Sequence, residues 1–229
     1  MKAIWCVAAA GLLWASSVQA AVTSSEQERV QKAAEVVMAM RDAPDKGIPE
    51  ELWNKANCVI VLPGVKKAAF GIGGEFGKGV MSCRMANAWS APVFMEMAKG
   101  SFGFQIGAQE ADLVLLVMNR NGIDKMLNDK VTLGADASVS AGPVGRTGAA
   151  ATDARLNAEI LSYSRSRGLF AGIDVSGGVL RPDKDSNADA YGTLAAHDIV
   201  LRGGVTAPTP IRTFVNALES NVRATTGQK

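Results

Sequence analysis

Residues 58–84 read CVIVLPGVKKAAFGIGGEFGKGVMSCR, and this stretch decides the predicted fold. Short runs rich in apolar residues and glycine alternate with the turn formers Pro63-Gly64 and Gly77-Lys78-Gly79. The pattern predicts consecutive antiparallel strands. The three runs are 58–62, 68–74 and 79–84. Further runs of the same kind lie at 101–109, 113–118, 131–141 and 158–178.

Apolar residues at helical spacing predict amphipathic helices at both ends of the sheet region. The first begins at Ser25, which with Glu28 has the form of a capping box, and ends near Arg41. The last runs from Pro210 to about Val222. We therefore expect an α+β fold: a mainly antiparallel, Gly-rich curved sheet or sandwich flanked by N- and C-terminal amphipathic helices. Shorter helices are predicted at 49–54 and 123–127.

Glycine alternates with large apolar residues in 70–73 (FGIG) and 102–107 (FGFQIG). One face of such a strand carries large side chains and the other carries almost nothing. Glycine in a strand marks a bend, or a close approach by another backbone or by a ligand. Two interpretations follow, a tightly curved sheet or a shallow groove that admits an acyl chain.

The N-terminus has the three parts of a secretion signal. Lys2 is followed by an apolar stretch at 3–15 and by a small-x-small pattern that ends before Ala21. We expect residues 1–20 to be a signal peptide and residues 21–229 to form a single domain. The mature chain is expected to be periplasmic or secreted.

The charge balance is close to neutral. The chain has 24 Lys and Arg against 22 Asp and Glu, and loss of Lys2 with the signal leaves 23 basic residues. A near-neutral chain gives no basis for nucleic acid as a partner. Any partner of opposite charge has to meet a local patch.

Two cysteines, Cys58 and Cys83, remain after the signal is removed. In an oxidising compartment we expect them to form a disulfide. Two buried free thiols are an alternative, as is a redox pair, although the spacing is not Cys-x-x-Cys.

The residues that catalysis requires are sparse. His197 is the only histidine, and no serine lies in a Gly-x-Ser-x-Gly elbow. The glycines at 71–79 miss the phosphate-loop spacing, because Ile72 stands where glycine is needed and Gly79 where Ser or Thr is needed. The sequence therefore predicts a protein that is not an enzyme and carries no cofactor.

An acidic segment near residue 185 resembles the start of a calcium loop. An EF-hand needs glycine where Ala188 stands and glutamate where Leu194 stands. A solvated turn and a weak calcium site both stay open as interpretations. The oxygen-bearing residues are Asp183, Asp185, Asn187 and Asp189.

Several basic residues flank the predicted turns and strands. Arg165 and Arg167 would project from one face of a strand, where they could hold a phosphate by forked hydrogen bonds. Scattered Lys and Arg can equally serve to solvate a surface. The candidate lipid-binding residues are Lys66, Lys67, Arg146, Arg165 and Arg167.

The order of several motifs resembles the SYLF domain, and the resemblance covers nearly the whole mature chain. Its most specific stretch is 163–172, YSRSRGLFAG. The supporting motifs are PGVKK at 63–67, WSAP at 89–92, GPVGR at 142–146 and YG at 191–192. The resemblance implies binding of phospholipid headgroups without catalysis, and binding of filamentous actin in some eukaryotic members.

The chain departs from those members at its N-terminus, where a removable signal stands in place of a membrane-engaging segment. The next helix carries Glu26, Glu28 and Glu35, which an anionic bilayer would repel. We therefore expect an exported lipid-binding protein whose partner is an anionic lipid or membrane surface, with actin an unlikely partner. The alternative is a structural or protein-interaction module of the cell envelope, with an envelope protein as partner.

Overall fold

The computed structural model describes residues 21–41, 47–86, 88–120, 123–144, 158–166 and 169–226, with the backbone alone at 40–41, 68–72, 101–108 and 221–226. Two long strands, β1 (Cys58–Cys83) and β2 (Val93–Val117), form the centre of the fold. The shorter strands are β3 (Val131–Thr132), β4 (Val139–Ala141), β5 (Ile160–Ser166), β6 (Leu169–Gly172) and β7 (Val179–Pro182). The helices are α1 (Ser24–Arg41), α2 (Glu50–Lys55), α3 (Ile123–Asn128), α5 (Lys184–Tyr191), α6 (Ala196–Leu201), η2 (Thr209–Ile211) and α7 (Arg212–Thr226).

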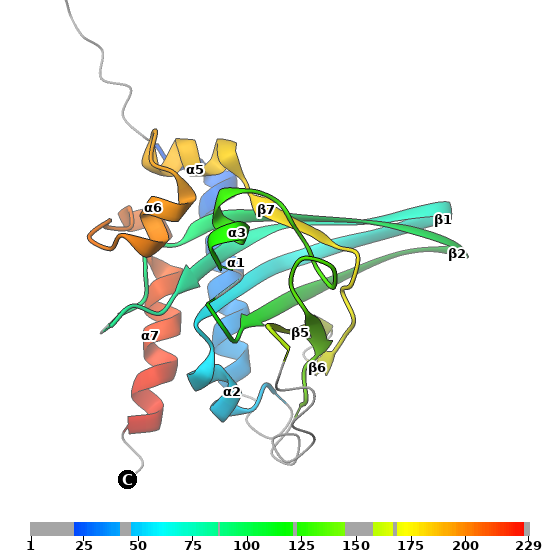
Figure 1. The fold of residues 1–229 in the computed structure, drawn as a ribbon, viewed down its shortest axis with the longest axis horizontal. Helices are drawn as coiled ribbons and strands as arrows, with labels where there is room; N and C mark the ends of the chain where they lie inside the picture. Colours follow the sequence, from blue (N-terminus) through cyan, green and yellow to red (C-terminus); the bar gives the residue numbers. More distant parts are fainter. Residues whose placement is uncertain are drawn as a thin grey trace, which may run out of the picture.

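The described strands join in one mostly antiparallel sheet. Its order is β3-β7-β2-β5-β4, with β1 paired to β2 and β6 paired to β5. Among these pairings, β4 with β5 is the parallel one. The sheet is strongly curled and the helices gather at one end of it (Figure 1). The predicted α+β class, a curved antiparallel sheet with flanking helices, is confirmed.

Strands β1 and β2 form a ribbon that doubles back on itself. Their pairing runs from Cys58 opposite Val117 to Met81 opposite Val93. A straight strand of the 26 residues in β1 would span about 85 Å. Instead the Cα atoms of Cys58 and Cys83 lie 3.9 Å apart. The ribbon therefore forms an arm that projects away from the helices and returns (Figure 1).

Glycine allows the outgoing and returning halves of β1 to touch. A Cβ at Gly79 would overlap the carbonyl oxygen of Val61 and would lie 2.7 Å from the Cα of Leu62. At Gly77 a Cβ would lie 2.6 Å from Cγ2 of Val65. These two glycines serve a close backbone approach within a curved sheet, which is one of the two functions expected of glycine in a strand.

The turns predicted at Pro63-Gly64 and Gly77-Lys78-Gly79 are wrong. Gly64 has a φ of 61° and sits at a register shift between Leu62 and Val65, so it forms a bulge within a continuous strand. Gly77 to Gly79 lie inside the returning half of β1. The chain reverses between these positions, near the register shift at Ala69 and Gly71.

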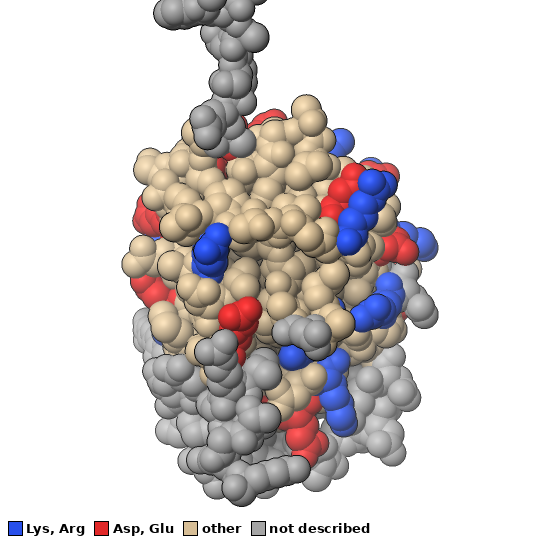
Figure 2. All heavy atoms as spheres, turned by 90° about the vertical axis from the view of Figure 1, so that its left-hand side faces the viewer, with Lys and Arg blue, Asp and Glu red and all other residues tan. Residues whose placement is uncertain are grey.

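The first and last helices pack against each other, and α1 also packs against β1. In α1 the side chains of Val30, Ala33 and Val37 are fully buried, and in α7 those of Phe214 and Leu218 are. This spacing of three to four residues gives each helix one apolar face, as predicted. Figure 2 shows the helical end of the molecule face on.

The N-terminal cap of α1 lies two residues earlier than the sequence predicts. Oε2 of Glu26 accepts the Thr23 N–H at 2.7 Å, and Oγ1 of Thr23 accepts the Glu26 N–H at 3.4 Å. Thr23 and Glu26 therefore form the capping box. Glu28 instead pairs with Lys32 at 2.8 Å, one turn along the helix.

A disulfide joins Cys58 to Cys83 and closes the base of the arm. The structure thus shows the expected disulfide and not two free thiols. The helices in the described part of the chain are too short or too polar to cross a bilayer.

Candidate functional site

Three of the five predicted basic residues lie in one region of the sheet, where β2 runs between β1 and β5. Lys66 and Lys67 are on the outgoing half of β1, and Arg165 is on β5. Arg146 and Arg167 lie outside the described residues.

Arg165 is held by an acid on the neighbouring strand. Its Nη1 lies 2.9 Å from Oδ2 of Asp112. The other oxygen of Asp112 accepts the backbone N–H of Gly64 at 3.0 Å. Asp112 therefore fixes both the β1 bulge and the Arg165 guanidinium, which has its counter-charge within the protein.

The two lysines differ in how they are paired. Nζ of Lys67 lies 2.9 Å from Oε1 of Glu75. Lys66 is exposed and stands opposite Glu110 in the strand register, with no ion pair to any residue that the structure describes. The region is thus a surface of mixed charge. Of the predicted lipid-binding residues that the structure describes, Lys67 and Arg165 each form an ion pair, whereas Lys66 forms none with a described residue.

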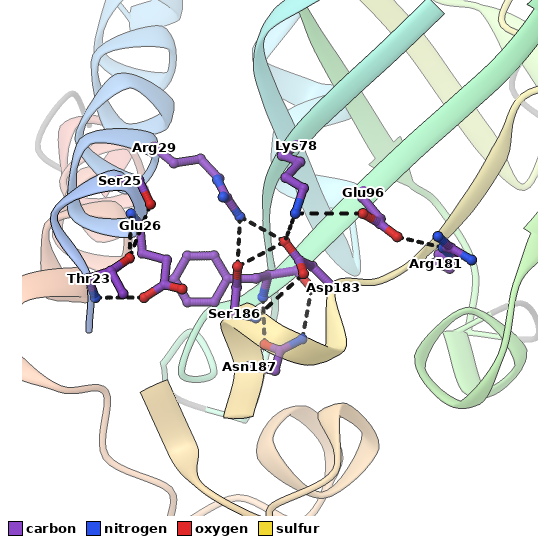
Figure 3. Close-up of polar contacts among 11 residues, drawn as sticks. Thr23, Ser25, Glu26, Arg29, Lys78, Glu96, Arg181, Asp183, Ser186 and Asn187 are labelled. Atoms are coloured by element: carbon purple, nitrogen blue, oxygen red, sulfur yellow. Dashed lines mark hydrogen bonds and ion pairs between the residues drawn. The ribbon is translucent and has the colours of Figure 1, made fainter. Parts of the chain in front are cut away.

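A second polar cluster centres on Asp183, at the junction of β7 and α5 (Figure 3). Its Oδ2 lies 3.1 Å from Nη1 of Arg29 on α1 and 2.8 Å from Nζ of Lys78 on β1. The same oxygen accepts a hydrogen bond from Oγ of Ser186 at 2.9 Å. The Asp183 side chain is 4% exposed, so two cations compensate a buried carboxylate.

The cluster extends to the surface through Glu96 on β2. Its carboxylate lies 3.8 Å from Nζ of Lys78 and accepts a hydrogen bond from Nε of Arg181 at 2.6 Å. Acids and bases therefore alternate from the helix α1 to the exposed edge of β7 (Figure 3). The network links α1, β1, β2, β7 and α5 into one unit.

Asp183 is charged despite its burial. Desolvation alone would raise the pKa of its carboxyl group, but the hydrogen bonds from Lys78 and Ser186 and the charge of Lys78 hold the pKa below its ordinary value. The carboxylate also caps α5, since it accepts the Ser186 backbone N–H at 3.4 Å.

The segment that resembled a calcium loop is a helix, so the expected solvated turn is wrong. Asn187 accepts the Phe94 N–H at 2.8 Å and donates to the Phe94 carbonyl at 2.9 Å. Asp185 and Asp189 are exposed on α5. Asp183 and Asn187 therefore face the protein interior, and the described residues contain no group of three or more His, Cys, Asp or Glu that could hold a metal ion.

The sequence contained each member of the Asp183 cluster without indicating that they meet. From the sequence alone, Asp183 is an oxygen-bearing residue of the segment that resembles a calcium loop, and Lys78 is part of the predicted turn Gly77-Lys78-Gly79. Arg29 and Lys78 lie 154 and 105 residues away from Asp183 along the chain. The buried acid between two cations is a tertiary feature that no local spacing indicates.

Comparison with known proteins identifies the family. The model of the Ysc84 family, described as "Las17-binding protein actin regulator", matches residues 98–221, from β2 into α7. LAS seventeen-binding protein 3 of Saccharomyces cerevisiae is 31% identical over 180 residues, which cover 77% of this chain and 39% of the relative. SH3 domain-containing YSC84-like protein 1 of Bos taurus is 30% identical over 207 residues, covering 87% of this chain and 60% of the relative.

The curled antiparallel sheet with its packed terminal helices defines an α+β domain. The chain belongs to the Ysc84/SYLF family, as the order of its motifs indicated. It spans between 39% and 60% of the length of these two relatives.

The expectation that actin is an unlikely partner is wrong. The family is described as an actin regulator, and the yeast relative is named for binding LAS seventeen. That expectation rests on the N-terminal part of the chain, namely residues 1–20 and the acidic helix with Glu26, Glu28 and Glu35, whereas the family model matches residues 98–221.

Proposed function

We propose that this chain is a binding protein that acts without catalysis, and that its partner is an actin-regulating protein of the kind for which its relatives are named. The observation that carries the proposal is the family match over residues 98–221. That match spans most of β2, the helix α5 and part of α7, and it leaves out α1 and β1.

The helical end of the molecule supports a protein partner. Figure 2 shows this face, where neutral residues cover most of the middle and charged side chains lie mainly towards the edges. The centres of protein interfaces are depleted in charged residues. Leu194, in the connection between α5 and α6, is 45% exposed and offers an apolar contact.

Co-sedimentation with filamentous actin and pull-down with purified yeast Las17 test the proposal directly. We expect saturable binding to at least one of the two, with little change on raising the salt concentration, because the face is mostly neutral. Absence of binding to both, with the protein shown to be folded, would overturn the proposal. Purified components make the outcome independent of where the chain resides in a cell.

A second function, contact with anionic lipid headgroups, is proposed from the exposure of Lys66. This lysine forms no ion pair with a described residue, although it stands opposite Glu110 on β2, and it lies across β2 from Arg165. A phosphate could bind Lys66 and share the Arg165 guanidinium, which is 27% exposed. Lys67 is the next residue along the strand, so its side chain projects from the opposite face, where it pairs with Glu75.

Sedimentation with phosphatidylglycerol vesicles at low salt tests the lipid proposal. We expect Lys66→Glu to lower the bound fraction several-fold, because it places a negative charge beside the phosphates. Lys184→Glu, at an exposed position on α5, is the matched control and should bind as the unaltered protein does. Equal binding by both variants would refute a role for Lys66.

We also propose that residues 1–20 direct export and are removed. Support comes from their tripartite pattern and from the Cys58–Cys83 disulfide, a bond typical of oxidising compartments. The mass of the protein purified from its native cells should correspond to a chain that begins at Ala21. A mass that includes residues 1–20 would contradict export by this route.

A further inference from the structure

A pocket of about 520 Å³ lies at the base of the arm, away from both polar regions described above. It is bordered by the end of β1, the chain that follows it, the residues around α3, and α6, and α3 contacts α6. Its apolar lining includes Met85, Ile123 and Leu201. A volume of this size is in the range of small-molecule sites.

Arg84 provides a desolvated cation in this pocket. Burial lowers the pKa of its guanidinium. Its hydrogen bonds to the carbonyl oxygens of Ala56 and Trp53 are long, at 3.4 and 3.5 Å. Within the described residues it has no acid within ion-pair distance, whereas Arg29, Lys78 and Arg165 each have one.

One aromatic ring partly compensates this charge. The Arg84 guanidinium lies over the ring of Trp89, 4.5 Å from its centroid. The indole N–H groups of Trp53 and Trp89 are buried and lack an acceptor in the described part of the chain. The Arg84 guanidinium is therefore compensated by one aromatic ring and two long hydrogen bonds to carbonyl oxygens, and not by an acid among the described residues.

Arg120 brings a second guanidinium to the same pocket. It is exposed, and its Nε donates to Oδ1 of Asn57 at 3.4 Å. The amide of Asn57 is itself anchored by a 2.8 Å hydrogen bond to the Met118 carbonyl. Asn57 thus holds Arg120 beside the pocket while leaving most of its donors available.

One acid also borders the pocket, but it does not neutralise the arginines. Asp124 is 70% exposed, and its carboxylate lies 3.7 Å from Nε2 of His197 on α6. Neither Arg84 nor Arg120 forms an ion pair with it. The pocket therefore combines an apolar lining with two guanidiniums that form no ion pair with any residue that the structure describes.

We propose that this pocket binds an organic anion with one carboxylate or phosphate group, whose oxygens are held by Arg84 and Arg120 while its apolar body packs against Met85, Ile123 and Leu201. Guanidinium groups match both oxyanions in geometry and form charge-assisted hydrogen bonds with them. Helix α6 contributes Leu201 to this pocket and also belongs to the helical end proposed for a protein partner (Figure 1). The pocket lining includes neither Leu194 nor Lys66, so its test with small probes does not depend on either proposed function.

Calorimetric titration of the full purified chain with four probes tests the proposal. Octanoate and octyl phosphate carry both features of the ligand, octanol lacks the charge, and inorganic phosphate lacks the apolar body. We expect saturable binding of at least one of the first two, and binding of octanol and inorganic phosphate at least about tenfold weaker. Comparison of octanoate with octyl phosphate identifies the preferred oxyanion.

Two arginine variants locate the site. Because Arg120 is exposed, Arg120→Gln should fold normally and weaken binding about tenfold, and Arg84→Gln should weaken it further. Arg202→Gln is the matched control, since Arg202 is 73% exposed, follows α6 and pairs with Asp198. Failure of all probes to bind, equal binding of octanol, or unchanged affinity in Arg120→Gln would each overturn the proposal.

Discussion

Gly79 lies directly against the backbone of Val61, with room for a hydrogen atom and not for a methyl group. The contact joins the returning half of β1 to its outgoing half, so it fixes how tightly the arm doubles back. The atoms that a Cβ would meet, the carbonyl group of Val61 and the Cα of Leu62, belong to strand backbone, which cannot move aside as a flexible side chain could.

Replacing Gly79 by Ala should therefore destabilise the protein. We expect a loss of about 2 kcal/mol or more in the free energy of unfolding, because the added methyl group forces the strands apart. Urea denaturation of the variant and the unaltered protein measures this difference in the free energy of unfolding. Gly100→Ala is the control, since a Cβ there meets nothing within 4 Å. Equal stability of the two variants would show that β1 does not need the close approach.

The disulfide at the base of the arm should contribute to stability. Its cysteines are 25 residues apart, and closing a loop of that length is worth about 3 kcal/mol by the chain-entropy model. The double variant Cys58→Ser, Cys83→Ser should unfold at correspondingly lower urea concentration. Adding a reductant should lower the midpoint of the unaltered protein and leave that of the variant unchanged. A reductant effect on both would point to another cause.

The Asp183 cluster should make stability depend on acid pH. The pKa of Asp183 is lower in the folded protein than its ordinary value of about 3.9. Its contribution is therefore fully present above that ordinary value and is lost as the pH falls through the lowered folded pKa.

Asp183→Asn removes this contribution and leaves Arg29 and Lys78 beside a neutral group. We expect a loss of about 3 kcal/mol near neutral pH, which shrinks as the pH falls below the ordinary pKa of aspartate. Urea denaturation at several pH values measures the difference from the unaltered protein. Asp185→Asn, on the exposed side of α5, should show no such trend. A difference that stays constant with pH would exclude the carboxylate as its source.

The helical face proposed for a protein partner can be mapped with one substitution. Leu194→Glu places a charge in the exposed connection between α5 and α6 and should weaken partner binding by tenfold or more, about 1.4 kcal/mol. Phe76→Ser alters another exposed apolar residue, 50% exposed on the arm, and should leave binding unchanged. If Phe76→Ser alone weakens binding, the arm and not the helical end is the interface.

The terminal helices could be predicted because their pattern is local. Val30, Ala33 and Val37 recur at helical spacing, and the structure buries all three. The capping box was placed two residues late, because Ser25 with Glu28 and Thr23 with Glu26 both fit the motif. Burial of the Glu26 side chain decides between them, and burial cannot be derived from the motif.

The path of the sheet could not be derived in this way. Pro63-Gly64 and Gly77-Lys78-Gly79 are turn formers in most sequences, yet here one forms a bulge and the other packs against Val61 and Val65. The deciding contacts join positions about 12 to 18 residues apart in one strand. Similarly, Asp183 was recognisable as an acid, but its partners on α1 and β1 were not. Candidate residues can be recognised one by one in the sequence, whereas the contacts between distant residues depend on the fold.

The bond between Cys58 and Cys83 makes the intervening segment a covalent ring. A protease that cuts the arm once between these cysteines would open the ring without releasing either piece. The nicked protein would run as one band on a denaturing gel without reductant and as two bands with it. A single cut in the β1 part of the arm would therefore leave the two pieces joined in an oxidising medium, so the protein would stay covalently linked without an intact β1 backbone.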